Sequence, residues 1–174
     1  MLPYAIEHSV GVLTARLEVR PPVEADRERF VQLFQDPDFM VFSDGVHDAE
    51  SAHRRFDGML QDAQGVPFAK QPVIELASGL IIGYTGVAWF EFEGEQRLEY
   101  GYRLISDARG RGYATEAGLA LLTVAKSFPG ELLAMIDPRN DASKNVIRKL
   151  GFQFWKRALI NGWDDELYRR PPEF

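Results

Sequence analysis

The sequence predicts one α/β (α+β) domain built on a mixed, mostly antiparallel central sheet of about seven strands, flanked by about four helices. The chain has 174 residues, of which 45% are apolar and 26% charged, a globular composition of single-domain size. Segments with the two-residue period of strands alternate with helical segments in the order β-α-α-β-β-β-α-β-α-β-β. No internal repeat or linker interrupts this order, so we expect residues 1–174 to form a single domain.

The N-terminal segments are predicted to form one strand and two helices. Apolar and polar residues alternate over Leu13–Arg20, and Pro21 and Pro22 end this strand. Apolar residues then recur about once per helical turn over Glu24–Gln35, which indicates the first helix. Asp48 is suited to capping a second helix, in which apolar residues again share one side.

The middle of the chain is predicted to form three consecutive antiparallel strands. The strand-like runs are Pro72–Leu76, Leu80–Phe90 and Leu98–Ile105. Ser78 and Gly79 form a turn signal between the first two runs, and residues 93–95 form another before the third. Connections this short join antiparallel neighbours, so we expect a meander.

The most regular helical pattern in the sequence follows this meander. Small and apolar residues occupy one narrow stripe, at positions Ala114, Ala117, Gly118, Leu121, Leu122 and Ala125. Small residues on the stripe indicate that this helix packs closely on the sheet. The remaining predicted elements are a strand at Leu132–Ile136, a helix at Ser143–Leu150, and strands at Phe152–Leu159 and Trp163–Arg170. The regular helix and the strand after it complete a β-α-β crossover.

The charge balance argues against nucleic acid as a partner. The chain carries 20 Lys and Arg against 26 Asp and Glu, for a net charge of −6, so no broad basic surface is expected. Residues 1–90 account for the whole acid excess, with 7 basic and 13 acidic side chains. This excess either attracts a cationic partner or, as is more common, simply covers solvated helix surfaces.

The residue types that are missing exclude several chemistries. The chain has no cysteine, which rules out disulfides, thiolate metal sites and a cysteine nucleophile. His8, His47 and His53 lack metal-ligand spacing, so no metal is predicted. The first residues lack the basic region of a secretory signal, and the longest uncharged run, Leu76–Phe90, is too short to span a membrane. We therefore expect a cytoplasmic protein.

The strongest chemical signal is the loop that leads into the regular helix. With the first turn of the helix, its residues are Arg109, Gly110, Arg111, Gly112, Tyr113, Ala114 and Thr115. A helix N-terminus presents unpaired N–H groups and the positive end of the helix dipole, and glycines let a phosphate approach the backbone. The two arginines and the Thr115 hydroxyl add side-chain donors. The loop is therefore predicted to bind a pyrophosphate.

The loop allows two other interpretations. The glycines can simply form a tight strand-to-helix turn, with both arginines facing water. Gly110 and Gly112 also begin the G-x-G-x-x-G pattern of dinucleotide-binding folds. That pattern fails in detail, because its third glycine position is Thr115 and the segment follows a meander with which such folds do not begin.

Two motifs carry a resemblance to a known family. The first, (Arg/Gln)-x-x-Gly-x-(Gly/Ala), is met by Arg109, Gly112 and Ala114, and its extension Gly-Tyr-Ala-Thr-Glu-Ala is met by Gly112–Ala117. The second pairs an Asn-x-x-Ser motif with a Lys-Leu-Gly-Phe ending.

In this chain the second motif appears as Asn140 and Ser143, followed by the ending at Lys149–Phe152. With both motifs, the chain resembles the GNAT superfamily of acyl-CoA N-acyltransferases, and within it the RimJ/RimL-type N-acetyltransferases. The resemblance covers nearly the whole chain.

The resemblance implies a GNAT-like fold with acetyl-CoA as co-substrate. It implies that the pyrophosphate lies on the loop Arg109–Thr115 and the pantetheine arm beside the strand that ends at Leu104 and Ile105, in a gap before the next strand. Asn140 and Ser143 match positions at the far side of that arm. Considered without the family, Asn140 or Asp141 is a helix N-cap, and this role is compatible with one at the cofactor.

Because cysteine is absent, direct attack of the amine on the acetyl group in a ternary complex is the simplest scheme. Glu99 is the candidate general base, since the family often has a carboxylate at the matching place, although a strand carboxylate can equally face solvent. The tyrosine that the family often uses as acid is absent from Val146–Arg148, so Ser143 is the candidate acid. Backbone N–H groups near Leu104 could hold the oxyanion. Four aromatic residues have two possible roles: they line the acceptor pocket or, as is more common, belong to the core. These residues are Trp89, Phe92, Tyr100 and Tyr102.

The sequence thus predicts an acetyl-CoA-dependent N-acetyltransferase that acts on a primary amine, either a protein N-terminus or a small molecule. The alternative is a non-catalytic acyl-CoA-binding or sensing module of the same fold, suggested by the missing tyrosine. The expected partners are acetyl-CoA and an amine, with no nucleic acid, membrane or metal. Dimers are common in this family, so a homodimer is considered, and the acceptor is not chosen by the fold.

Overall fold

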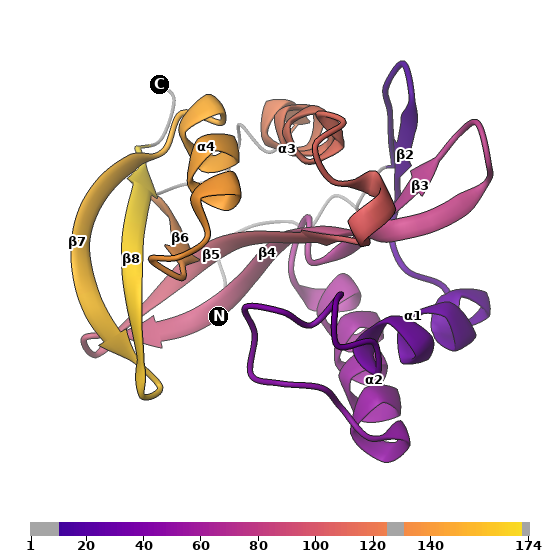
Figure 1. Ribbon diagram of the computed structural model, residues 1–174, viewed down its shortest axis with the longest axis horizontal. Helices are drawn as coiled ribbons and strands as arrows, with labels where there is room; N and C mark the ends of the chain where they lie inside the picture. Colours follow the sequence, from indigo (N-terminus) through magenta and orange to yellow (C-terminus); the bar gives the residue numbers. More distant parts are fainter. Residues whose placement is uncertain (1–10, 125–130, 172–174) are drawn as a thin grey trace.

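An eight-stranded sheet with the order β1-β2-β3-β4-β5-β6-β8-β7 forms the centre of the protein (Figure 1). The computed structural model describes residues 11–124 and 131–171. The strands are β1 (Val12–Leu13), β2 (Leu17–Val19), β3 (Gln71–Glu75), β4 (Leu80–Phe92), β5 (Glu95–Leu104), β6 (Leu132–Ile136), β7 (Gln153–Ile160) and β8 (Trp163–Arg170). All neighbouring strands in this order are antiparallel except β5 and β6, which are parallel. The mixed, mostly antiparallel sheet predicted from the sequence is confirmed.

Helices cover both faces of the sheet. Those in the described residues are α1 (Arg27–Phe34), α2 (Ala49–Gly65), α3 (Tyr113–Val124) and α4 (Asp141–Lys149), with short 3₁₀ turns at Glu24–Asp26 and Ser106–Ala108. Figure 1 shows α1 and α2 on one face of the sheet and α3 and α4 on the other. Asp48 caps α2 by accepting a hydrogen bond from the Ser51 N–H at 2.7 Å, as the sequence predicted. In the described part of the chain, no helix is long and apolar enough to cross a membrane.

The single strand predicted at Leu13–Arg20 is instead a small hairpin of β1 and β2. The Thr14 hydroxyl accepts a hydrogen bond from the Leu17 N–H at 2.9 Å, and the Thr14 N–H donates to the Leu17 carbonyl, which closes a turn inside the predicted strand. Leu17 and Val19 are fully buried, whereas Leu13 is 72% exposed. The apolar–polar alternation therefore corresponds to burial only after the turn, in β2. Because the turn divides the predicted strand into β1 and β2, the sheet has eight strands instead of about seven.

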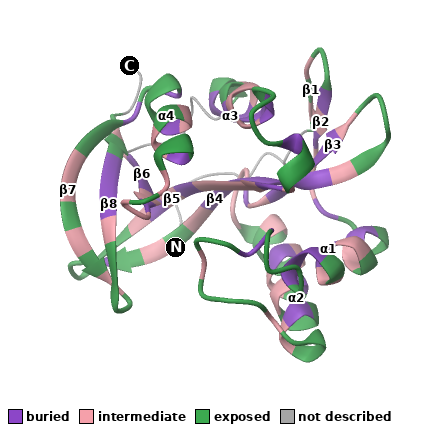
Figure 2. Cartoon of the chain, in the orientation of Figure 1, coloured by how far each residue is buried: buried purple, intermediate pink, exposed green. Residues whose placement is uncertain are grey.

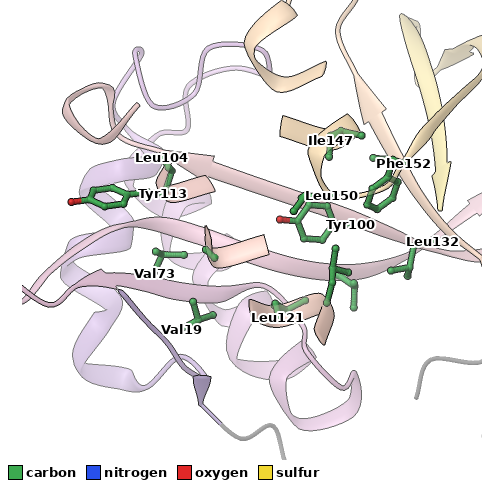
Figure 3. Close-up of a cluster of buried hydrophobic side chains, with 14 of the residues drawn as sticks. Val19, Val73, Tyr100, Leu104, Tyr113, Leu121, Leu132, Ile147, Leu150 and Phe152 are labelled. Carbon is green, nitrogen blue, oxygen red and sulfur yellow. The ribbon is translucent and has the colours of Figure 1, made fainter. Parts of the chain in front are cut away.

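Two apolar cores lie on the two faces of the sheet, and Figure 2 shows buried segments running along the central strands between them. The core under α1 and α2 is mainly aromatic and includes Phe30, Phe34, Phe39, Phe56 and Tyr84. The core under α3 and α4 is larger; Figure 3 shows Tyr100 beside Leu150, with Leu104 and Tyr113 farther along the sheet. The buried Tyr100 hydroxyl is hydrogen-bonded to the Thr85 hydroxyl at 2.9 Å, so its polar end is satisfied.

Helix α3 packs closely on the sheet, as the stripe of small residues predicted. A Cβ atom added to Gly118 would lie 2.6 Å from the Tyr100 hydroxyl and 2.7 Å from a Leu150 methyl group. Ala117, Leu121 and Leu122 of the same stripe are buried, while its last member, Ala125, lies outside the described residues.

We expect Gly118→Ala to lower the free energy of unfolding by about 1–3 kcal/mol, because the added methyl overpacks the contact between α3 and Tyr100. The matched control is Gly58→Ala in α2, where an added Cβ meets nothing within 4 Å. Alanine favours a helix there, so this variant should be unchanged or about 1 kcal/mol more stable. Urea denaturation measures both changes, and equal stability of Gly118→Ala and the wild type would contradict the packing argument.

Candidate active site

The site begins where β5 and β6 separate. Strand β5 is paired with β4 along its full length, but it pairs with β6 only at Leu98 and Glu99. The Ile105 N–H donates to the Ile82 carbonyl at 2.9 Å, so the opposed pair of Gly83 and Leu104 is not itself hydrogen-bonded. The backbone groups of Leu104 therefore point away from β4, as do those of Tyr102 two residues earlier. They face the gap beyond the last β5–β6 pair.

A cleft with a volume of about 580 Å³ lies at this gap. Successive side chains of β5 point to opposite faces of the sheet, and residues of both faces line the cleft. Tyr100, Tyr102 and Leu104 lie on the face covered by α3 and α4, while Glu99 and Arg103 lie on the face of α1 and α2. The cleft is thus bordered by both faces.

On the α3 side, the cleft is bordered by the loop before that helix. Gly110 and Gly112 adopt left-handed φ angles of 70° and 80°, a conformation that glycine accepts without strain. The first helical hydrogen bond at this end joins the Glu116 N–H to the Gly112 carbonyl at 3.0 Å. The N–H groups of Tyr113, Ala114 and Thr115 precede it and have no partner within the helix, which makes this end suited to an anion.

Most residues predicted for the cofactor border the cleft. They are Leu104, Arg109, Gly110, Gly112, Tyr113, Ala114, Thr115, Asn140 and Ser143. Ile105 and Arg111 are not among its lining residues. The Arg111 guanidinium forms an ion pair with Glu75 at 3.3 Å, so its charge is directed to β3.

Arg109 borders the cleft but is held by other groups. Its Nε donates to the Leu104 carbonyl at 3.1 Å, and its Nη2 donates to the Asp38 carbonyl at 2.8 Å. Its Nη1 also lies 3.3 Å from the Asp38 carboxylate. Arg109 therefore ties the end of β5 to the segment that follows α1, and the phosphate fork expected from the sequence is partly occupied by these contacts.

The N-terminal hairpin supports the loop from the side. Thr14 Oγ1 donates to Glu116 at 2.6 Å, and the Arg16 guanidinium contacts Glu116 at 2.6 Å and donates to the Arg111 carbonyl at 3.0 Å. Burial alone would raise the pKa of Glu116, but the hydrogen bonds from Thr14 and Arg16 outweigh it and the pKa is lowered. The sequence showed Glu116 only as one position of the Gly112–Ala117 motif. Its structural role could not be predicted, because its partners Thr14 and Arg16 are about 100 positions away.

We expect Glu116→Gln to lower the free energy of unfolding at pH 7 by roughly 1–2 kcal/mol, because the charged hydrogen bonds are lost. A carboxyl with a lowered folded pKa contributes stability above its unfolded pKa, near ~4.3, and loses it as pH falls through the folded pKa. The difference from wild type should therefore shrink below about pH 4.

The control is Glu50→Gln, which removes an exposed carboxylate paired with Arg54 in the first turn of α2. An exposed helix pair is worth about 0.3–0.5 kcal/mol, so this variant should change little. A pH-independent loss at Glu116 would contradict the electrostatic assignment.

Glu99 lies on the α1 and α2 side of the cleft and is paired with Lys70. The two charged groups are 3.2 Å apart, and the Glu99 side chain is 14% exposed. Gly101 leaves room for them, because a Cβ there would lie 2.7 Å from Lys70 Nζ and 2.9 Å from Glu99 Oε1. Burial opposes the charge of Lys70, but the attraction of Glu99 outweighs it and the Lys70 pKa is raised.

On the other side of the cleft, Tyr102 and Ser143 form a hydroxyl pair. The Tyr102 hydroxyl donates to Ser143 Oγ at 3.1 Å. Burial raises the pKa of Tyr102, so its hydroxyl stays protonated at neutral pH. The Ser143 N–H donates to the Asn140 side chain at 3.0 Å, which confirms Asn140 as the N-cap of α4.

The other aromatic residues considered from the sequence differ in their surroundings: Phe92 is buried, whereas Trp89 is 44% exposed. Tyr100 belongs to the core and also lines the cleft, whereas Trp89 and Phe92 are not among its lining residues. No three metal-ligating side chains are grouped within residues 11–124 and 131–171. His8 lies outside these ranges.

The separation of β5 from β6 beside a glycine loop at a helix N-terminus agrees with the arrangement expected from the resemblance to the GNAT superfamily. Residues 16–153 match the family model of the acetyltransferase (GNAT) domain. The protein therefore belongs to the GNAT acetyltransferase family, and its mixed α/β fold is a GNAT fold.

Relatives and solved structures agree with this membership. The chain is 28% identical over 157 residues to the uncharacterized protein YkkB of Bacillus subtilis, a match that covers 88% of this chain and 90% of that protein. It is 26% identical to an acetyltransferase from Agrobacterium tumefaciens, with a TM-score of 0.77 and coverage of 97% and 96%. The fold is also similar to that of the ribosomal alpha-N-protein acetyltransferase RimL in complex with coenzyme A, at 18% identity and a TM-score of 0.73, with coverage of 93% and 98%.

Proposed function

We propose that this protein transfers the acetyl group of acetyl-CoA to a primary amine by direct attack in a ternary complex. One observation carries the proposal: a single cleft is bordered by the glycine loop at the α3 N-terminus and also by Glu99, on the opposite face of β5. A donor bound from one face and an amine entering from the other would meet at the gap between β5 and β6.

The residues on the α3 side fit a coenzyme A thioester. The N–H groups at the start of α3 suit its phosphates, and Lys149 adds a positive charge among the residues that line the cleft. The backbone groups of Tyr102 and Leu104, which face the gap, suit the amide groups of a pantetheine arm. The thioester supplies an activated acetyl group, and the Leu104 N–H is oriented to donate to an oxygen placed in the gap.

Glu99 is proposed to receive the proton of the attacking amine. Its carboxylate borders the cleft and is held by Lys70 at 3.2 Å, so it has a defined position on the acceptor side. Ser143 is proposed to give a proton to the leaving thiolate, and the Tyr102 hydroxyl, 3.1 Å away, to restore the serine proton. This hydroxyl pair takes the place of the helix tyrosine whose absence suggested a non-catalytic module.

Finer assignments belong to the same proposal. The RimJ/RimL-type motif Gly112–Ala117 and the likeness to RimL support membership of that subfamily. A single N-acetyltransferase domain over residues 1–174, a cytoplasmic location and an ability to form dimers are proposed with it.

Binding of acetyl-CoA is tested by calorimetry with Gly112→Asp. Gly112 has a φ of 80°, and an aspartate there adds strain and a negative charge beside the α3 N-terminus, so we expect affinity to fall at least about 10-fold. Gly162→Asp is the matched control, because Gly162 has a φ of 88° in the β7–β8 turn, away from the cleft. Equal loss in both variants, or none in either, would exclude the proposed binding loop.

The role of Glu99 is tested by following release of the CoA thiol with Glu99→Gln. We expect turnover to fall by about 10²–10⁴-fold, as for loss of a general base, while acetyl-CoA affinity stays within about twofold. Glu91→Gln on β4 is the control, since that exposed carboxylate does not line the cleft. Acetyl-CoA binding without turnover of any amine by the wild type would instead favour the non-catalytic module.

A further inference from the structure

The side chain of Lys70 lies across two strands of the sheet, and two opposed glycines make room for it. Gly86 of β4 and Gly101 of β5 are register partners. A Cβ atom on Gly86 would lie 2.6 Å from the Lys70 Cα, and one on Gly101 would lie 2.7 Å from the Lys70 Nζ. The lysine backbone therefore lies against the first glycine and its ammonium group against the second. A side chain at either glycine position would collide with it.

Backbone contacts fix the point from which this side chain starts. Lys70 immediately precedes β3, and its neighbour Ala69 forms a parallel bridge with Val87 of β4. The Val87 N–H donates to the Phe68 carbonyl at 2.9 Å, and Ala69 is buried. The lysine therefore begins from a buried, hydrogen-bonded segment, and its ammonium group is directed to one place on β5.

That place is the Glu99 carboxylate. Lys70 Nζ donates to Glu99 Oε2 at 3.2 Å, and both side chains line the cleft, with 24% and 14% of their surface exposed. In the part of the chain that the structure describes, Lys70 forms no ion pair with another carboxylate. Two charges that are largely shielded from water act on each other more strongly than an exposed pair, because water screens them less. The charge of Lys70 is therefore coupled to the ionisation of Glu99.

Other charged and titratable groups of this face come from α2, β4 and β5. Tyr84 of β4 lies beside the lysine, with 5.7 Å between Lys70 Nζ and the centre of its ring. Burial alone would raise the pKa of Tyr84, but the surrounding cations outweigh it and the pKa is lowered. Those cations include Arg55 of α2, which has a carboxylate partner of its own, and Arg103, four residues along β5 from Glu99. Lys70 is the cation that contacts the Glu99 carboxylate.

Carboxylates act on Glu99 from the side of β6 and β8. Burial, together with repulsion from Asp137 and other carboxylates that include Glu99, raises the pKa of Asp165 on β8. Asp137, which follows β6, is itself paired with Arg139 at 2.6 Å. Repulsion is mutual, so these groups also disfavour the charged form of Glu99, as does its burial. The contact with Lys70 opposes both effects.

We propose that Lys70 is a positioning residue, which holds the Glu99 carboxylate ionised and in a fixed orientation at the cleft. This role rests on the proposed acetyltransferase function, to which it adds the group that controls the base. A carboxylate accepts the amine proton only in its ionised form. Because Lys70 donates to Oε2, Oε1 is the oxygen left to receive that proton.

The first test follows the ionisation of Glu99 by NMR and needs no acceptor. In protein labelled with carboxyl-¹³C glutamate, the Glu99 signal is the one missing from Glu99→Gln, and its chemical shift is measured against pH. Lys70→Met removes the charge and keeps a side chain of similar length, so we expect the titration midpoint of Glu99 to rise by about 1–3 pH units. The direction follows because a carboxylate without its cation keeps its proton to higher pH. A midpoint that is unchanged or lower would overturn the proposal.

Gly101→Ala gives the same test with both charged groups present. Its methyl group would lie 2.7 Å from Lys70 Nζ and 2.9 Å from Glu99 Oε1, so the ends of these two flexible side chains must move apart. We expect the midpoint to rise, by less than in Lys70→Met. An unchanged midpoint would overturn the coupling through this contact.

The matched control is Lys156→Met, because Lys156 also pairs with a glutamate, Glu93, but does not line the cleft. Its side chain is partly buried, like that of Lys70. The Glu99 midpoint in this variant should equal that of the wild type. A rise as large as in Lys70→Met would show a general effect of net charge and would overturn the role assigned to the contact.

The second test asks whether this ionisation governs transfer. The kcat for 2-phenylethylamine and for L-alaninamide is measured by release of the CoA thiol, because kcat reports the groups of the bound complex and not those of the free amine. We expect the acidic limb of kcat to move to higher pH in Lys70→Met by the same amount as the NMR midpoint. A merely structural role would lower kcat equally at every pH and leave the limb in place, which would overturn the proposal.

A double substitution separates this role from the proposed function. In a Glu99→Gln background, Lys70→Met should have no further effect on kcat, because the group through which it acts is gone, and an additive loss would overturn the proposal. A wild type without turnover of any amine, but with the NMR midpoint raised in Lys70→Met, would reject the acetyltransferase function alone. Turnover that depends on Glu99, with an unchanged NMR midpoint, would reject the role of Lys70 alone.

Discussion

The separation of β5 from β6 beyond Glu99 is the constraint on which the site depends. It leaves backbone N–H and C=O groups of β5 facing a gap, and unpaired buried groups of this kind cost about 1–3 kcal/mol each. The surrounding elements support the gap. Helices α3 and α4 cover one face of the sheet, and Arg109 Nε donates a hydrogen bond to the carbonyl of Leu104 at the end of β5. A sheet that was fully paired here would have no passage between its faces.

The two-residue period of β5 then divides one strand between the two halves of the site. Tyr102 and Leu104 point to the side of the glycine loop, whereas Glu99 and Arg103 point to the acceptor side. Gly101 leaves room on that side for the pair of Glu99 and Lys70. The proposed donor and acceptor sites thus lie on opposite faces of the same strand, which suits the direct transfer proposed above.

Arg109 and Arg111 of the glycine loop, and Arg16 beside it, mainly fix the position of the loop, because their charges are paired or hydrogen-bonded within the protein. Arg111 is paired with Glu75, Arg109 with Asp38, and Arg16 holds Glu116 together with the Arg111 carbonyl. The N–H groups at the start of α3, which have no partner within the helix, therefore remain available to an anion on that side. On the other face of β5, the partners of Arg103 among residues 11–124 and 131–171 are neutral.

The local sequence pattern was enough to predict the order of the elements, with β6 and β8 at their observed bounds. It also located the glycine loop. Both succeeded because periodicity and glycine conformation depend on residues that are near in the sequence. It failed at Leu13–Arg20, where one Thr14 turn reverses the chain without breaking the alternation. Only the tertiary structure could decide which side chains meet. The Lys70–Glu99 pair and the Tyr102–Ser143 pair join positions 29 and 41 residues apart, and their contact depends on strand register and on where two strands part.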